Sequence, residues 1–196
     1  MADDRKMLMV HHNLLPNDAA PDFTLDSVVD GIVEKFSLSS LKGKNALLFF
    51  YPVDFGYVSP SEFYQLESLM EQFKLTNCEV VAISTEHTPS MIKFQKAAKD
   101  IAGLGGNMKI RLVSDPNGDA AKSYGVLKAE ENVSFKAIVL IDKDSRIISC
   151  EKYDFPIGCN FEEILKKVQM SVSQEGKKVP GCSTCEITGF VHGCQK

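Results

Sequence analysis

The chain of 196 residues has a formal net charge of −4 at pH 7, with 44% apolar and 24% charged residues. This composition predicts one globular unit with a sizeable core, and the lack of a long basic run excludes nucleic acid and anionic membranes as expected partners. No run of about 18 consecutive apolar residues occurs, so no membrane span is predicted, and the polar start of the chain does not resemble a secretory signal.

Continuous apolar runs and helical spacing alternate along the chain. In chain order the predicted elements are a strand at 45–51, a helix at 60–73, a strand at 80–84, helices at 89–99 and 117–124, strands at 137–141 and 146–150, and a helix at 161–172. A polar turn at 142–145 should join the last two strands as a hairpin. Three fully apolar strands imply a sheet that is covered on both faces, which indicates an α/β fold.

The helical periodicity stops after the last predicted helix. From Ser173 onward Gly, Lys, Pro and Cys dominate. We therefore predict a folded domain at 1–172 and a cysteine-containing tail at 173–196.

The cysteines are few for this length and unevenly placed. They are Cys78, Cys150, Cys159, Cys182, Cys185 and Cys194. This pattern does not fit a secreted disulfide framework, so we expect a reducing, cytoplasmic location. Cys78 and Cys150 adjoin apolar strands, where a free cysteine is usually a small buried hydrophobe.

Several short motifs occur in a specific order between about residue 14 and residue 170. They are Ala20-Pro21-Asp22-Phe23, Phe49-Phe50-Tyr51-Pro52, Ala102-Gly103-Leu104-Gly105-Gly106, Leu112-Val113-Ser114-Asp115-Pro116, Tyr124-Gly125-Val126 and Phe155-Pro156-Ile157-Gly158. In this combination the chain resembles the typical two-cysteine peroxiredoxins, also called thioredoxin peroxidases or AhpC/TSA proteins. The resemblance implies a thioredoxin-like fold with a central mixed sheet flanked by helices, a homodimer or a decamer-like ring of dimers, a thioredoxin-like reductant if the chain is active, and no cofactor.

The resemblance also indicates where the family's peroxide-reducing site would lie. In that pattern a proline, a hydroxyl residue and the reactive cysteine follow at intervals of four and three. Here these positions hold Pro52, Gly56 and Ser59. A serine hydroxyl is far less acidic than a thiol and cannot form a sulfenic acid, so we predict negligible peroxide reduction by the chain as written.

Three further positions of the implied site lie farther apart in the sequence. Glu62 is retained, Lys136 stands where the resemblance implies an arginine, and Cys159 stands where it implies a second arginine. Lysine keeps the charge but lacks the planar fork that binds two oxygens at once.

Ser59 itself has two interpretations. Ser59-Pro60-Ser61-Glu62 has the form of a capping box, in which the serine caps a helix and Glu62 reaches back to it. Alternatively, the serine is an engineered replacement for cysteine. These interpretations lead to two functional hypotheses: a non-catalytic member that acts as a chaperone or as an oligomer partner, or a thioredoxin-dependent peroxidase whose reactive cysteine has been replaced.

The tail leaves three alternatives open. Cys182 and Cys185 are candidates for the family's resolving cysteine, which forms a disulfide with the reactive one. Together with His192 and Cys194 they also offer four soft ligands for zinc, although the second pair is closely spaced. The third alternative is an unstructured tail. His87, in a loop after a predicted strand, is a weaker catalytic candidate.

Overall fold

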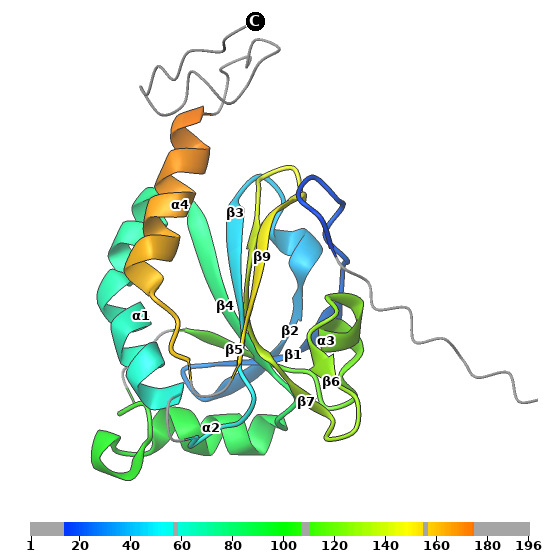
Figure 1. Ribbon diagram of the computed structural model, residues 1–196. Coiled ribbons are helices and arrows are strands. Elements are labelled where there is room, and N and C mark those ends of the chain that lie inside the picture. Colours follow the sequence, from blue (N-terminus) through cyan, green and yellow to red (C-terminus); the bar gives the residue numbers. More distant parts are fainter. Residues whose placement is uncertain (1–13, 57–58, 107–109, 155–156, 175–196) are drawn as a thin grey trace, which may run out of the picture.

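The structure is a computed structural model and describes residues 14–56, 59–106, 110–154 and 157–174. A seven-stranded mixed sheet forms its centre, with the strands in the order β2-β1-β5-β4-β3-β8-β9 (Figure 1). A separate two-stranded sheet, β6-β7, follows α3 in the chain. The strands are β1 Thr24–Val29, β2 Ile32–Ser37, β3 Asn45–Phe50, β4 Cys78–Ser84, β5 Arg111–Ser114, β6 Leu127–Lys128, β7 Val133–Ser134, β8 Lys136–Ile141 and β9 Ile147–Tyr153. The helices are α1 Ser59–Leu75, α2 Thr88–Lys96, α3 Asp119–Ser123 and α4 Phe161–Gln174, with short 3-10 turns at Leu38–Leu41 and Lys99–Ile101.

The sheet is covered on both faces, as the apolar strands predicted. Every residue of β3 and β8 is buried, and alternate side chains of β3 enter different cores. Leu47 and Phe49 pack with residues of α1, α2 and α4, whereas Leu48 and Phe50 pack with α3 and Phe36 of β2. Burial on both faces explains the unbroken apolar run in β3. The predicted α/β architecture, a mixed sheet flanked by helices, is therefore confirmed.

Most predicted elements are present, with shifted ends. The hairpin between β8 and β9 forms as expected, and α4 runs two residues beyond the predicted helix. The predicted helix at 89–99 is wrong at its end, because α2 stops at Lys96 and the chain turns into a short 3-10 segment. The predicted helix at 117–124 starts too early, since Gly118 has a φ of 69° and α3 begins only at Asp119.

Some strands carry no clear sequence signal. β2 is exposed along most of its length and mixes apolar with charged residues, while β6 and β7 have two residues each. Short or solvated strands of this kind lack the alternating pattern on which a prediction depends. Within the described residues no helix has the length and apolar character needed to cross a membrane.

One buried polar side chain joins three parts of the fold. Gln95 of α2 is only 4% exposed; its amide oxygen accepts a hydrogen bond from the Gly31 N–H at 3.0 Å, and its nitrogen lies 3.2 Å from the Ile110 carbonyl and 3.4 Å from that of Val28. Gln95 thereby satisfies backbone groups of the β1-β2 turn and of the segment before β5.

Replacing Gln95 should therefore be costly. We expect Gln95→Ala to lower the free energy of unfolding by about 2–3 kcal/mol, because it leaves buried backbone groups without partners. Urea unfolding followed by circular dichroism measures this change. Gln169→Ala, at an exposed position of α4, is the matched control and should change stability by less than about 0.5 kcal/mol. Equal effects of the two substitutions would contradict the assignment.

Candidate active site

The segment between β3 and α1 carries the first group of predicted site residues. It leaves the sheet at Tyr51, whose carbonyl accepts a hydrogen bond from the buried Ser134 hydroxyl at 2.8 Å. The Pro52 carbonyl lies 3.4 Å from the Ser84 hydroxyl. Hydroxyl groups from β7 and β4 thus fix the start of the loop, and both Pro52 and Gly56 are half-buried. Phe55 has a left-handed backbone with φ 54°, and its ring stacks edge-on against Phe94 at 5.1 Å.

Ser59 is the first residue of α1, so the helix is present and begins one residue before its predicted start at 60. Its side chain lies outside what the structure describes, and the capping hydrogen bond remains a prediction. The contacts that the structure describes for Glu62 run elsewhere: its carboxylate is directed to β8 and to the segment before α4. Its contact back to Ser59 also remains a prediction.

Glu62 and Lys136 form a buried ion pair. The Lys136 ammonium lies 3.0 Å from Glu62 Oε1, and the two side chains are only 2% and 4% exposed. The same ammonium donates to the Ile157 carbonyl at 2.9 Å, and the Cys159 N–H donates to Glu62 Oε1 at 2.8 Å. The first turn of α1, the start of β8 and the β9-α4 connection are therefore joined through one carboxylate oxygen.

The other oxygen of that carboxylate receives no donor. Glu62 Oε2 is buried and has no hydrogen-bond partner in the part of the chain that the structure describes. An ammonium group binds as a point charge, whereas a guanidinium group would present two parallel N–H donors to both oxygens. The lysine at position 136 thus neutralises the carboxylate but leaves it half satisfied.

Cys159 is brought next to this pair, in surroundings that disfavour its thiolate. Its side chain is 6% exposed, and burial, followed by the nearby Glu62 carboxylate, raises the pKa of the Cys159 thiol well above its ordinary value. Burial likewise raises the pKa of Cys78 to about 12 and that of Cys150 above its usual range. Because the thiolate is the nucleophile, these surroundings disfavour a nucleophilic role for all three. Cys78 is buried as predicted, while Cys150 is only half-buried.

A second buried carboxyl group lies in the loop and was not predicted from the sequence. Asp54 is 7% exposed, and its Oδ1 accepts a hydrogen bond from the Tyr51 hydroxyl at 2.9 Å. Burial raises the pKa of Asp54 to about 6; the charge of Glu86 acts in the same direction, while the hydroxyls of Ser90 and Tyr51 oppose it. The loop therefore contains a group that ionises near neutral pH.

The raised pKa has a definite sign for stability. A carboxyl group that holds its proton more tightly in the folded state stabilises the fold at low pH, and this contribution is lost as the pH rises through the folded-state pKa of about 6. Asp54→Asn keeps the shape and cannot ionise. We expect the stability of this variant, relative to the unmodified chain, to rise by about 2 kcal/mol between about pH 4.5 and about pH 7.5. Urea unfolding at the two pH values tests this, and a difference that does not change with pH would contradict it.

The remaining predicted residues are not part of this cluster. His87 is exposed, precedes α2 and lines a cavity together with Asp115, away from the Glu62-Lys136 pair. Cys182, Cys185, His192 and Cys194 lie outside the described residues. Among the residues that are described, no group of three or more His, Cys, Asp or Glu side chains is arranged to hold a metal ion.

Comparisons with known proteins point in one direction. A model of the AhpC/TSA family matches residues 16–149. The chain is 36% identical to peroxiredoxin prdx-2 of Caenorhabditis elegans. The aligned region of 163 residues covers 82% of this chain and 81% of that protein. It is 37% identical over 151 residues to peroxiredoxin-1 of Gekko japonicus, covering 76% and 75%. Among solved structures, Enterococcus faecalis AhpC superposes with a TM-score of 0.77 at 31% identity, covering 85% of this chain and 99% of that one. The reduced Plasmodium vivax 2-Cys peroxiredoxin gives a TM-score of 0.78 at 29% identity, covering 82% and 98%. The thioredoxin-like fold is thereby confirmed.

Proposed function

The chain belongs to the AhpC/TSA family, among the typical two-cysteine peroxiredoxins, and from this membership we propose that it is a member without peroxidase activity that acts through its assembly and surface. The observation that carries the proposal is the residue at the start of α1. The family pattern assigns the reactive cysteine to this helix N-terminus, and this chain has Ser59 there.

The chemistry of the neighbouring groups supports this assignment. A hydroxyl group cannot be oxidised to a sulfenic acid, and Gly56 supplies no side-chain donor to a bound peroxide. The only described thiol beside the ion pair, Cys159, is held protonated by burial and by Glu62. Lys136 is committed to Glu62 and to the Ile157 carbonyl, so its ammonium is not directed toward a substrate.

Assembly is the second part of the proposal. We propose a homodimer that forms through β9, or a ring of such dimers. Among the described strands β9 is the last of the sheet and pairs only with β8. At its start Ile147 exchanges backbone hydrogen bonds with Asn17 and Asp18, and the edge beyond Ile147 is where a second copy would pair. Exposed apolar side chains such as Val53, Phe55 and Ile157 would serve a chaperone-like role toward partly unfolded proteins.

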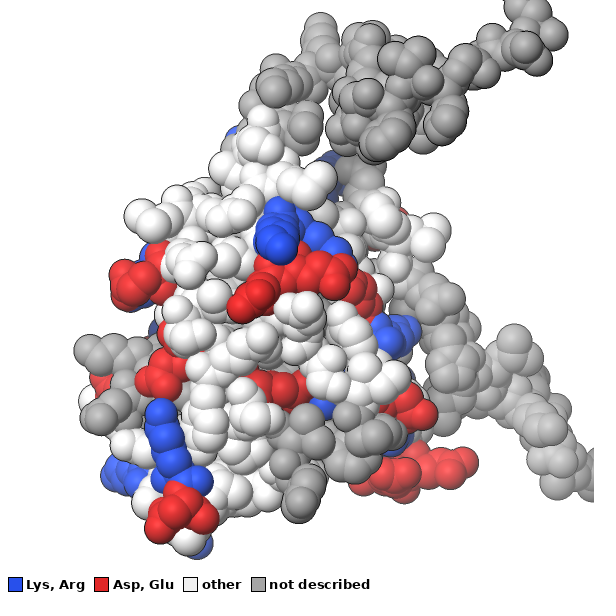
Figure 2. Space-filling view, turned by 60° about the vertical axis from the view of Figure 1, so that its left-hand side comes forward, with Lys and Arg blue, Asp and Glu red and all other residues white. Residues whose placement is uncertain are grey.

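Nucleic acid and membrane surfaces are not among the proposed partners. On the face that α1 and α4 cover, acidic and basic side chains are interspersed (Figure 2), and the chain carries a net charge of −4. A cytoplasmic location is proposed because Cys78, Cys150 and Cys159 are free thiols, which persist in a reducing compartment.

Two measurements test the proposal together. NADPH consumption with thioredoxin, thioredoxin reductase and hydrogen peroxide should show no turnover above that of the same system without the chain. Light scattering of heat-denatured citrate synthase should decrease when the chain is present, and multi-angle light scattering should give the mass of a dimer or of a larger ring. Peroxide turnover would overturn the non-catalytic part, and a monomer without holdase activity would overturn the rest.

The alternative is a thioredoxin-dependent peroxidase whose reactive cysteine has been replaced by Ser59. The Glu62-Lys136 pair at the first turn of α1 favours this candidate, because it keeps a cation close to the helix N-terminus. The codon for position 59 in the source organism separates the two, since a cysteine codon would establish the replacement and a serine codon would exclude it. If position 59 is a replaced cysteine, Cys182 and Cys185 are the candidates for the resolving role.

The tail could carry zinc in either case. Stoichiometric zinc that disappears from the Cys182→Ser/Cys185→Ser double variant would support a site that also uses His192 and Cys194. Zinc that is retained in the double variant would exclude it.

A further inference from the structure

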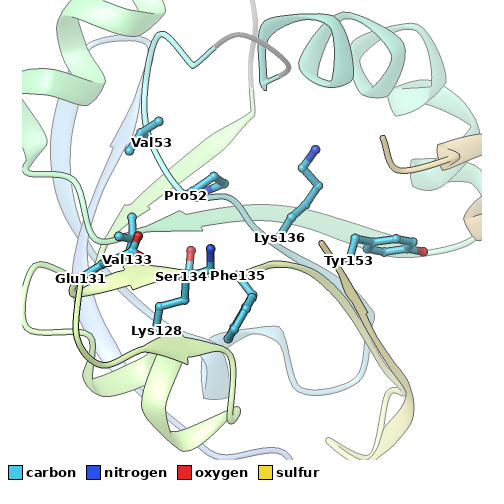
Figure 3. Close-up of a pocket in the computed structure, with 9 residues that line it drawn as sticks. All are labelled: Pro52, Val53, Lys128, Glu131, Val133, Ser134, Phe135, Lys136 and Tyr153. Atoms are coloured by element: carbon cyan, nitrogen blue, oxygen red, sulfur yellow. The ribbon is translucent and has the colours of Figure 1, made fainter. Parts of the chain in front are cut away.

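A cavity of about 290 Å³ opens beside the loop that follows β3. Its walls come from Pro52 and Val53 of the loop, from the β6-β7 hairpin and the segment after it, and from the adjoining ends of β8 and β9 (Figure 3). Most of the lining is apolar, including Val133, Phe135 and the ring of Tyr153. The volume is at the lower end of the range for small-molecule pockets.

Most polar groups at the cavity already have partners. The Ser134 hydroxyl donates to the Tyr51 carbonyl at 2.8 Å, and the Tyr153 hydroxyl donates to Glu151 at 2.9 Å. Lys136 lines the cavity with its stem, but its ammonium points away from Ser134 and Val133 (Figure 3) and is bound to Glu62. None of these groups is available to orient a ligand.

Lys128 differs from them. Its ammonium lies 5.0 Å from the centre of the Phe135 ring, and it forms no ion pair with any described residue. The side chain is half-buried, and a charge without an ion-pair partner among the described residues gains from a nearby anion. Glu131, the other charged group without such a partner, is exposed and well hydrated, which makes its attraction for a cationic ligand weak.

We infer that this cavity binds a small amphipathic carboxylate, with its carboxylate group at Lys128 and its apolar body against Pro52, Val133 and the Tyr153 ring. Charge complementarity selects the anion, and the apolar lining selects the aliphatic or aromatic body. The site uses no thiol and no residue at position 56 or 59, so it holds whether or not the chain is a peroxidase.

Octanoate, below its critical micelle concentration, is a suitable probe. Titration of the ¹⁵N-labelled full chain, followed by two-dimensional NMR, should shift the amide signals of residues 128, 133–136 and 153. Octan-1-ol and octylamine have the same apolar chain and should bind at least about tenfold more weakly, a difference of about 1.4 kcal/mol. Equal binding of octylamine, or shifts confined to other parts of the chain, would overturn the inference.

Three variants make the test specific. Lys128→Met should weaken octanoate binding about tenfold while keeping the apolar stem, and Val133→Phe should abolish binding by filling the cavity. Lys42→Met, at an exposed lysine that does not line the cavity, is the matched control and should bind like the unmodified chain. The dispersion of the NMR spectrum reports whether each variant is folded. Unchanged affinity in folded Lys128→Met would assign binding to the apolar surface alone and overturn the role of the charge.

Discussion

Ser59→Cys alone should leave the chain a poor peroxidase, and Gly56→Thr/Ser59→Cys/Lys136→Arg should reduce hydrogen peroxide at least about a hundredfold faster than the single variant. A thiol at the N-terminus of α1 supplies the nucleophile. The threonine hydroxyl and the guanidinium fork supply donors to the oxygens whose charge develops during attack, and removal of one such donor typically costs about 10²–10³ in rate.

The comparison requires all three proteins in one assay. Initial rates of thioredoxin-dependent peroxide consumption are measured for the unmodified chain, the single variant and the triple variant, with circular dichroism to establish that each is folded. Turnover by the single variant at the rate of the triple variant would contradict the prediction and show that Gly56 and Lys136 do not limit the site. An inactive triple variant would place the defect elsewhere, with Cys159 beside Glu62 as the next position to change.

The second large effect concerns the buried ion pair. We expect Lys136→Met to lower the free energy of unfolding by about 3–5 kcal/mol, because it leaves the Glu62 carboxylate buried without a countercharge. Adding Glu62→Gln removes that charge and keeps an acceptor for the Cys159 N–H, so the double variant should be more stable than Lys136→Met alone.

The test is a double-mutant cycle. Urea unfolding is measured for the unmodified chain, for Lys136→Met, for Glu62→Gln and for the double variant. The matched control is Lys44→Met, which removes the lysine of an ion pair with Glu79 whose side chains are 48% and 46% exposed. That exposed pair should contribute less than about 1 kcal/mol. A double variant no more stable than Lys136→Met would show that packing around residue 136, rather than the charge on Glu62, dominates.

The strength of each sequence signal explains which elements were predicted. The run at 45–51 is long, apolar and bounded by polar residues, and it forms the central strand β3. The apolar spacing at 161–172 likewise gives α4. β5 has only four residues, and β2 has a mixed composition because it is exposed. Neither strand therefore shows the apolar run or the alternation from which a strand is predicted.

For the site, the sequence motifs indicated which residues belong to it, but not how their side chains are directed. The order of short motifs was sufficient to single out Glu62, Lys136 and Cys159, which the structure brings into contact. The Tyr51-Asp54 hydrogen bond was missed, although a lone aspartate among apolar residues in this loop is a signal for a buried polar group. The direction of the Glu62 side chain depends on where β8 lies in the sheet, which local sequence does not specify.

The buried pair also bears on how such a chain can evolve. Because Glu62 and Lys136 join α1, β8 and the segment before α4, loss of either one carries a cost in folding that is independent of catalysis. Gly56 has no side chain and therefore no comparable structural duty among the described contacts. A lineage that no longer needs peroxide chemistry is free to drift at such a position while purifying selection continues to act on the charged residues behind it, and an inactive descendant retains part of the signature of its active ancestors.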